Sequence, residues 1–248
     1  MTITFYDIAS STKGVAWSPS TWIIRYCLNY KNIPYTTEWV ELGEIETHCK
    51  KLGIPPTSKR RDGSPLYTLP AIYDPSTNTY LADSLPIARY LESQYPETRS
   101  IFPHSSGALH LAFTKALLDE IDAVTPFVVP AIYNILSPAT QAYFRRTREI
   151  SWGKKLEEIA PQGEDKMVRW AKFRNGLGNV AEWFSMNGGG PFVMGHTLSW
   201  SDIILASELA WFRATWGENS AEWKDLLSWH GARWETFLPN MKDYETVV

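Results

Sequence analysis

Two features near the middle of the sequence could together hold an anionic ligand: a proline that leads an apolar strand and a polar pair that opens a helix. Pro70 stands in the apolar run 69–73. Its missing N–H lets the local backbone face a ligand instead of a neighbouring strand. Asp83 and Ser84 stand at a predicted helix N-terminus, whose unpaired N–H groups and positive dipole end attract anions. A ligand with a carboxylate would fit between them, although an ordinary strand-leading proline and an ordinary helix cap also explain each feature taken alone.

The order of these elements resembles the glutathione-binding core of the glutathione transferase superfamily: Leu-Pro, a hairpin, Asp-Ser and an amphipathic helix. The resemblance implies that the Leu69–Pro70 bond is cis and that the backbone beside it pairs with the cysteinyl part of glutathione. It also implies that Asp83 and Ser84 hold the γ-glutamyl end. With glutathione as cosubstrate, the expected binding residues are therefore Leu69, Pro70, Asp83 and Ser84.

Ser18 is the candidate for activating the glutathione thiol. The pKa of a free thiol is about 8.5, so only a few per cent of it is thiolate at neutral pH. Lowering that pKa by about two units requires roughly 2.7 kcal/mol of preferential thiolate stabilisation. A charge-assisted hydroxyl bond of about 1.5–3 kcal/mol, with up to about 1 kcal/mol from a helix N-terminus, is sufficient. Ser18 and Pro19 lie where the first predicted strand gives way to a helix, and a plain helix cap explains the same pair.

The run from Ser18 to Leu28 resembles the Ser-Pro segment of serine-type glutathione transferases. It looks especially like the fungal etherase-related FuA class and the bacterial β-etherases. This resemblance ranks Ser18 above the other hydroxyls nearby, which are Ser10, Ser11, Thr12, Ser20 and Tyr6. Neither Cys27 nor Cys49 stands at the Ser18 position, so thiol-disulfide chemistry of the omega type is disfavoured.

A basic cluster lies in the polar loop predicted over residues 55–65. It contains Lys59, Arg60 and Arg61, and one of these side chains could pair with the glycine carboxylate of glutathione. For any one of them, a solvated surface position is the commoner role. We take Lys59 as the candidate residue for binding that carboxylate.

The composition limits the classes of partner. A formal net charge of −3 over 248 residues gives no global attraction to nucleic acid or to an anionic membrane. The N-terminus lacks a basic segment followed by an apolar core, and no run of about 18 apolar residues could span a bilayer. Two cysteines without C-x-x-C spacing fit a reducing compartment. We therefore expect a cytoplasmic protein that binds small molecules, without a nucleic-acid partner, a membrane partner or a metal.

The first part of the chain predicts an α/β domain. Strand patterns cover residues 3–8, 35–41, 69–73 and 79–82, and helical patterns begin at residues 18, 45 and 83. The order β-α-β-α-β-β-α resembles a thioredoxin-like domain, the fold on which glutathione transferases are built. We assign residues 1–97 to this glutathione-binding domain, because the chain from residue 96 to residue 106 is rich in turn residues and reads as a linker.

Residues 98–248 predict an all-α domain that contributes the acceptor site. No strand pattern is convincing there, and the helical stretches are 108–124, 138–160, 165–186, 199–216 and 221–230. Ser199 and Asp202 have the spacing of a capping box. They resemble the capping box of a buried helix in glutathione transferases, whose role is in folding, so both are left out of the site.

Two functions of different class fit these patterns. The first is an enzyme that transfers glutathione to hydrophobic aromatic electrophiles, with aryl ethers implied by the β-etherase resemblance. The second is a ligandin, a non-catalytic carrier of aromatic or polyphenolic small molecules. Aromatic richness, with 12 Trp, 12 Tyr and 10 Phe, suits both. The family usually forms homodimers, which we expect here.

Four aromatic side chains are acceptor-site candidates by position, and a place in the core explains each of them as well. They are Trp17, Phe127, Tyr133 and Trp216.

Overall fold

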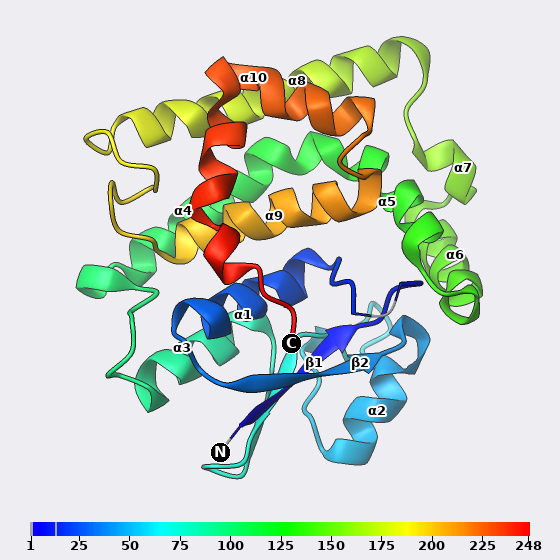
Figure 1. The fold of residues 1–248 in the computed structure, drawn as a ribbon. Helices are drawn as coiled ribbons and strands as arrows, with labels where there is room; N and C mark the ends of the chain where they lie inside the picture. The colour runs from blue at the N-terminus through cyan, green and yellow to red at the C-terminus, as the bar shows by residue number, and fades with distance from the viewer. Residues whose placement is uncertain (1, 13) are drawn as a thin grey trace. The chain divides into compact units, whose positions relative to one another are not determined.

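The computed structural model describes residues 2–12 and 14–248 and divides the chain into two compact units (Figure 1). The first unit comprises Met1–Ser100, Leu136–Phe144 and Tyr244–Val248, and the second comprises Ile101–Ile135 and Arg145–Asp243. The predicted fold class, a thioredoxin-like α/β part followed by a helical part, is confirmed. The boundary placed after residue 97 from the sequence stays a prediction.

The first unit is built on a mixed four-stranded sheet with the order β2-β1-β5-β6. Strand β1 is parallel to β2 and antiparallel to β5, and β5 pairs antiparallel with β6. The parallel pair requires a crossover connection, which α1 supplies. The strands of this sheet are β1 (Ile3–Ile8), β2 (Tyr35–Val40), β5 (Ala71–Asp74) and β6 (Thr79–Ala82).

The helices of the first unit begin and end where the sequence signals predict. They are α1 (Pro19–Tyr30), α2 (Ile45–Leu52) and α3 (Ser84–Gln94). Ser18 is the N-cap residue of α1, and Pro19 is its first helical residue, where the missing N–H costs nothing. Gly53 ends α2 with φ of 73°, a conformation that glycine adopts without steric penalty. Helices α1 and α3 pack against each other on one face of the sheet, with α2 on the opposite face (Figure 1).

A buried ion pair joins α1 to the sheet. Nη2 of Arg25 lies 2.7 Å from Oδ2 of Asp7 in β1, and both side chains are 0% exposed. The guanidinium also donates to the Tyr35 hydroxyl at 3.1 Å and lies 5.0 Å from the centre of the Phe5 ring. Removing one partner of such a pair leaves an uncompensated buried charge. The pair therefore fixes how α1 lies on β1.

The polar loop predicted over residues 55–65 is more ordered than expected. It contains a two-stranded hairpin of β3 (Ser58–Lys59) and β4 (Pro65–Leu66). Asp62 and Gly63 make its turn: the Asp62 carboxylate accepts from the Ser64 amide at 2.9 Å, and Gly63 has φ of 83°. The strands are too short to give an alternating pattern, which is why the sequence indicated a loop.

The last residues of the chain return to the first unit. The Asn29 side chain donates to the carbonyls of Tyr244 and Thr246, at 2.7 and 2.9 Å. The Tyr26 hydroxyl contacts the Glu245 carboxylate at 3.0 Å. In the segment 136–144, Ser137 donates to Glu41 at 2.7 Å, and Thr140 donates to the same carboxylate. Both late segments thus satisfy polar groups of the α/β unit.

The second unit is helical, as predicted. Its helices are α4 (Gly107–Ile121), α5 (Thr125–Ile132), α7 (Leu156–Ile159), α8 (Gly163–Ser185), α9 (Trp200–Trp216) and α10 (Ala221–Phe237). Helix α6 (Pro138–Trp152) is divided between the two units. Short 3-10 turns cover Leu42–Glu44, Pro103–Ser105, Asp122–Val124, Tyr133–Ile135, Leu238–Asn240 and Lys242–Tyr244.

Two predictions in the helical part were wrong in detail. Helix α5 was missed because Pro126 and Pro130 argue against a helix, yet Pro126 falls in the first turn, where proline is tolerated. The stretch 138–160 is two helices separated at Gly153, whose φ is 65°. Helix α10 is interrupted at residues 229–232, where the backbone is not helical, so the predicted end at residue 230 falls at this kink, and a further helical segment runs on to Phe237.

Helix α9 is buried on every side and begins with the predicted capping box. The Ser199 amide and hydroxyl donate to Oδ2 of Asp202 at 2.9 and 2.7 Å, and the Val193 amide donates to Oδ1 at 2.7 Å. Burial raises the pKa of Asp202 to about 6, against the opposing effect of these hydrogen bonds. No helix in the described residues has both the length and the apolar composition needed to cross a membrane.

Replacing Arg25 with methionine should lower the free energy of unfolding by about 3–5 kcal/mol, because Asp7 is left buried without its cation. Urea denaturation followed by circular dichroism measures the change. Arg89→Met is the matched control, since Arg89 is an exposed residue of α3 and should change stability by less than about 0.5 kcal/mol. Equal stability of the two variants would contradict a structural role for the pair.

Glu208 in α9 should make stability depend on pH. It is 9% exposed, and burial raises its pKa from 4.5 to about 8. Between these values the folded state binds the proton that the unfolded state releases, so stability falls as the pH rises. Its favourable contribution is complete below pH 4.5 and is lost as the pH rises through about 8.

The neutral variant Glu208→Gln should therefore melt close to wild type at pH 4.5. At pH 9 it should melt at least about 2–4 °C higher, which is the shift per kcal/mol for a chain of this size. Thermal melts across this pH range measure the effect, and the exposed Glu235→Gln is the control. A difference between Glu208→Gln and wild type that does not change with pH would count against the titration.

Candidate functional site

The register of the sheet places the end of β1, the start of β5 and the end of β6 side by side. Ala71 at the start of β5 pairs with Tyr6 near the end of β1, and also with Ala82 at the end of β6. Pro70 and Asp83 therefore leave the sheet at the edge where β1 runs on toward α1. The Asp83 amide donates to the Pro70 carbonyl at 3.0 Å. The strand-leading Pro70 and the Asp83–Ser84 pair, which the sequence suggested would act together, are thus in direct contact.

The backbone at Leu69 lacks partners of its own. The Leu69–Pro70 bond is cis, as the family resemblance implied, and Leu69 is 4% exposed. In the part of the chain that the structure describes, neither the Leu69 N–H nor its carbonyl takes part in a hydrogen bond. Since buried backbone groups are nearly always paired, this donor and acceptor suit an extended, peptide-like ligand.

Asp83 is the N-cap residue of α3, but its side chain does not cap the helix. Its backbone has φ of 77° and ψ of 138°, a conformation that costs a non-glycine residue about 1–3 kcal/mol. The alternative explanation from the sequence, in which Asp83 is an ordinary side-chain cap of the helix, is therefore excluded. The exposed carboxylate and the neighbouring Ser84 hydroxyl lie at the positive end of α3 without helping to hold it.

Asp74 positions α3 on the hairpin, a role that sequence reasoning missed. Its buried carboxylate accepts from the Ser76 amide at 2.8 Å and from the hydroxyls of Tyr90 and Tyr95 at 2.8 and 2.7 Å. Burial alone would raise the pKa of Asp74, but hydrogen bonds from Ser76 and Tyr95 bring it below its ordinary value. An aspartate in a turn is common, so only its spacing to two tyrosines on the next helix could have signalled this network.

The Ser18 hydroxyl is not used to cap α1. Ser18 has an extended backbone, with φ of −72° and ψ of 129°, and its side chain makes no capping hydrogen bond. Its carbonyl instead accepts from the Trp22 amide at 3.0 Å and from the Thr21 hydroxyl at 3.1 Å. Ser18 is 5% exposed, and its hydroxyl lies at a helix N-terminus without a capping hydrogen bond.

The basic cluster contains one committed side chain, Arg60, and two side chains, Lys59 and Arg61, that form no ion pair with any described residue. Nη2 of Arg60 lies 2.7 Å from the Glu46 carboxylate, so Arg60 holds the β3–β4 hairpin against α2. Lys59 is exposed, and its ammonium forms no ion pair with any described residue. The geometry leaves Lys59 able to meet an anion.

Both cysteines are buried, and burial raises the pKa of each thiol. They are therefore protonated at neutral pH and unsuited to nucleophilic chemistry. No group of three or more His, Cys, Asp or Glu side chains suited to a metal ion occurs among the residues described.

The aromatic candidates have different surroundings. Trp17 is 5% exposed, and its indole N–H donates to the Ala9 carbonyl at 3.2 Å. Tyr133 lies under the Arg145 guanidinium, 4.8 Å from ring centre to Cζ. Phe127 and Trp216 both contact Trp170, with ring centres 5.2 and 5.8 Å apart. Trp170 therefore joins two of the candidates, although the sequence did not single it out.

Comparison with known proteins was made for the sequence and for the structure. Residues 17–94 match the N-terminal domain model of the glutathione S-transferases, and residues 108–244 match their C-terminal domain model. A glutathione S-transferase-like protein of Aspergillus flavus, ustS, is 34% identical over 224 residues, which cover 84% of this chain and 79% of that protein.

Two solved structures are similar over nearly their whole length. The glutathione S-transferase CsGST63524 of Ceriporiopsis subvermispora, in complex with glutathione, is 43% identical with a TM-score of 0.94. The glutathione transferase GSTFuA3 of Phanerochaete chrysosporium is 40% identical, also with a TM-score of 0.94. In both cases the match covers 100% of this chain and 99% of the other.

The conformation of Asp83 gives a test of whether its side chain serves the fold. Asp83→Gly should be more stable than Asp83→Ala by about 1 kcal/mol, because glycine adopts a positive φ without steric cost. It should also be at least as stable as wild type, since the carboxylate caps nothing. Denaturant midpoints measure all three proteins. A Gly variant that is less stable than the Ala variant would show that the carboxylate or the backbone strain has been misread.

Proposed function

The chain belongs to the glutathione S-transferase family and is a glutathione transferase, and we propose that it is of the serine type. In this proposal the Ser18 hydroxyl activates the thiol of glutathione for attack on hydrophobic aromatic electrophiles. The observation that carries the proposal is the Ser18 side chain itself, which stands at the N-terminus of α1 and makes no capping bond there.

Glutathione would lie along the sheet edge where Pro70 and Asp83 meet. The Leu69 backbone N–H and carbonyl would pair with the cysteinyl residue beside the cis Pro70. Asp83 and Ser84 would hold the γ-glutamyl end, where the α-carboxylate meets the positive end of α3 and the α-amino group meets the Asp83 carboxylate. Lys59 would face the glycine carboxylate. Relatives solved in complex with glutathione support its place here as cosubstrate.

The reaction then follows from the polarity of the site. The Ser18 O–H donates to the glutathione sulfur, which favours the thiolate over the thiol. The thiolate attacks the electrophilic carbon of the acceptor, a C–S bond forms, and the leaving group departs with the electron pair. For an aryl ether the C–O bond breaks and the phenolate leaves, to be protonated from water. The ground for including aryl ethers among the acceptors is the resemblance of residues 18–28 to the bacterial β-etherases.

The acceptor would contact aromatic side chains. Trp17 directly precedes Ser18 and is the candidate from the α/β unit, while Phe127, Tyr133 and Trp216 are the candidates from the helical unit. The alternative function, carriage of aromatic or polyphenolic molecules without turnover, is favoured by the aromatic cluster around Trp170. The two functions differ in whether they depend on Ser18.

A cytoplasmic homodimer is the proposed state of the enzyme. Apolar side chains are exposed along α4, with Leu109 at 74%, Leu111 at 41% and Leu118 at 40%. Exposed apolar groups gathered on one helix are typical of a surface that another chain covers.

Ser18→Ala should lower kcat/KM for a generic aromatic electrophile by about 10- to 150-fold, the equivalent of one charge-assisted hydrogen bond of about 1.5–3 kcal/mol. The pKa of bound glutathione should rise by about one to two units. Thiolate absorbance as a function of pH measures that pKa, and glutathione affinity should change little.

The matched control is Ser20→Ala, an exposed serine in the first turn of α1, which should keep wild-type turnover. Unchanged turnover and an unchanged thiol pKa in Ser18→Ala would rule out Ser18 as the activating group. A wild-type protein that quenches its tryptophan fluorescence with polyphenols but turns over no electrophile would favour the carrier.

A further inference from the structure

Thr21 links Ser18 to the buried core of the first unit. It lies in the first turn of α1, three residues after Ser18, and it is 0% exposed. Its hydroxyl donates to the Ser18 carbonyl at 3.1 Å, and the Trp22 amide donates to the same oxygen at 3.0 Å. Threonine in a helix often bonds a carbonyl three or four residues earlier, and here that carbonyl belongs to Ser18. Two donors therefore hold the Ser18 backbone in its extended conformation.

The hydrogen bond between these two residues runs opposite to an ordinary helix cap. A serine at the N-cap usually accepts, through its hydroxyl, from the amide two or three residues later. The residue three later is Thr21, and its amide has no hydrogen-bond partner among the residues described. Because the Thr21 side chain instead donates to the Ser18 backbone, the start of α1 is held without the Ser18 hydroxyl.

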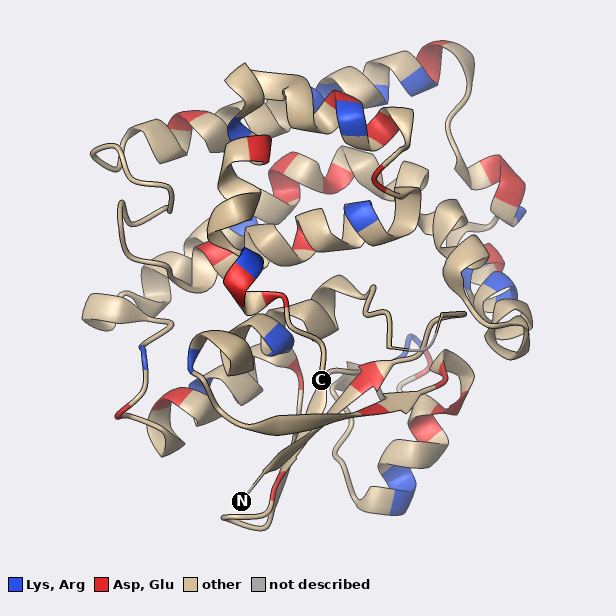
Figure 2. Cartoon of the chain, in the orientation of Figure 1, with Lys and Arg blue, Asp and Glu red and all other residues tan. Residues whose placement is uncertain are grey.

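A buried carboxylate holds the Thr21 hydroxyl from the other side. Burial raises the pKa of Asp7, and both Arg25 and a hydrogen bond from the Thr21 hydroxyl oppose that rise. Thr21 and Arg25 are four residues apart on α1, so they share the helix face that meets β1. Arg25 and Asp7 are the only charged residues in α1 and β1, as the colours of Figure 2 show. The Thr21 hydroxyl thus lies between the Ser18 carbonyl and the buried ion pair.

We infer that Thr21 is a positioning residue: by bridging Asp7 and the Ser18 backbone, it keeps the Ser18 hydroxyl out of the helix cap and directed at the glutathione sulfur. The inference rests on the serine-type function proposed above and adds to it the residue that orients the hydroxyl. Without the Thr21 hydroxyl, the Ser18 side chain turns toward the open Thr21 amide and caps α1 in the ordinary way, which moves it away from the sulfur.

Thr21→Val removes the hydroxyl and keeps the volume of the side chain. The pKa of bound glutathione should rise by about 0.5–1 unit, the effect of losing one neutral hydrogen bond. Below the wild-type thiol pKa, kcat/KM for a generic aromatic electrophile should fall about 3- to 10-fold. This loss should disappear at a pH above both thiol pKa values, where the thiol is ionised in either protein. Glutathione affinity should stay within about twofold, because Thr21 acts on the sulfur only through Ser18.

Two matched variants test whether the Thr21 hydroxyl is the cause. Thr21→Ser keeps a hydroxyl at this position and should match the wild-type thiol pKa. Thr37→Val removes a hydroxyl of β2 that accepts from Nη1 of Arg25 at 3.3 Å and makes no hydrogen bond with Ser18. It perturbs the same buried network without touching Ser18, so the thiol pKa should stay at the wild-type value.

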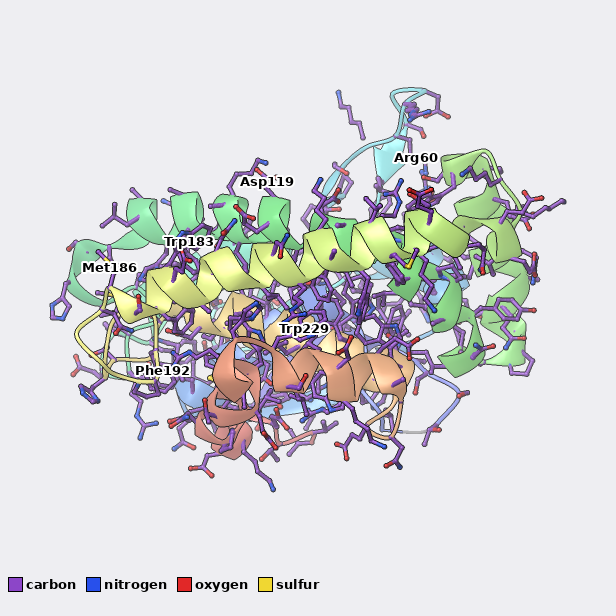
Figure 3. The ribbon with its side chains drawn as sticks, turned by 90° about the horizontal axis from the view of Figure 1, so that it is seen from above. Arg60, Asp119, Trp183, Met186, Phe192 and Trp229 are labelled. Carbon is purple, nitrogen blue, oxygen red and sulfur yellow. The ribbon has the colours of Figure 1, made fainter. Side chains whose placement is uncertain are left out.

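A third variant separates positioning from a loss of stability. Trp183 of α8 has its ring centre 5.5 Å from that of Phe113 in α4 and lies between these two helices in Figure 3. Trp183→Ala should lower the melting temperature through the loss of this packing and leave the thiol pKa unchanged. Thermal melts of every variant show that it folds.

A double variant tests whether Thr21 acts through Ser18. In the Ser18→Ala background, Thr21→Val should change the thiol pKa by less than about 0.2 unit, because the group that it positions is already gone. A full effect of Thr21→Val in that background would overturn the inference. An equal rise of the thiol pKa in Thr21→Ser or in Thr37→Val would overturn it as well.

The thiol pKa also separates this inference from the function on which it rests. A wild-type thiol pKa in Thr21→Val, together with a raised one in Ser18→Ala, would overturn the positioning role and leave the serine-type function standing. An unchanged thiol pKa in Ser18→Ala would remove the serine-type function itself, and the positioning role with it, whatever Thr21→Val does.

Discussion

The buried pair of Arg25 and Asp7 is the interaction on which the first unit depends. It couples α1 to β1 through two side chains that are fully buried, so the helix cannot slide on the sheet without separating two charges. Seven residues before Arg25, the same helix begins at Ser18. The geometry of a serine hydroxyl at the site edge is therefore set by an ion pair two turns away.

Two aspartates have similarly different roles in the β5–β6 hairpin and α3. Asp74 is fully committed to Ser76, Tyr90 and Tyr95, and it makes the hairpin and α3 into one rigid piece. Asp83, nine residues later, has no structural partner for its side chain and a backbone conformation that glycine would adopt more easily. Asp74 stabilises the fold, whereas Asp83 adopts an unfavourable backbone conformation without contributing a side-chain contact, which is the pattern expected if Asp83 is a binding residue, as proposed.

The sequence was sufficient where a local signal decides the structure. Ser18-Pro19, Gly53 and the Ser199–Asp202 box each mark a helix end through short-range geometry, and the Leu-Pro and Asp-Ser pairs marked the site edge. It was insufficient where local and tertiary signals oppose each other. Pro126 and Pro130 concealed α5, and Arg25 lies within an apolar helix face where only the partner strand explains a charge. A cavity in the helical unit is lined by residues of α5, α8 and α10, which no pattern in the sequence brings together.

The return of residues 136–144 and 244–248 to the α/β unit has a consequence for modularity. The helical unit is inserted, in two pieces, into a chain that both begins and ends in the other unit. Glu41 and Asn29 are satisfied by those late segments, so a fragment cut at the linker would have unmet polar groups. Replacing the chain after residue 100 with that of a relative would therefore also replace the two segments that contact Glu41 and Asn29.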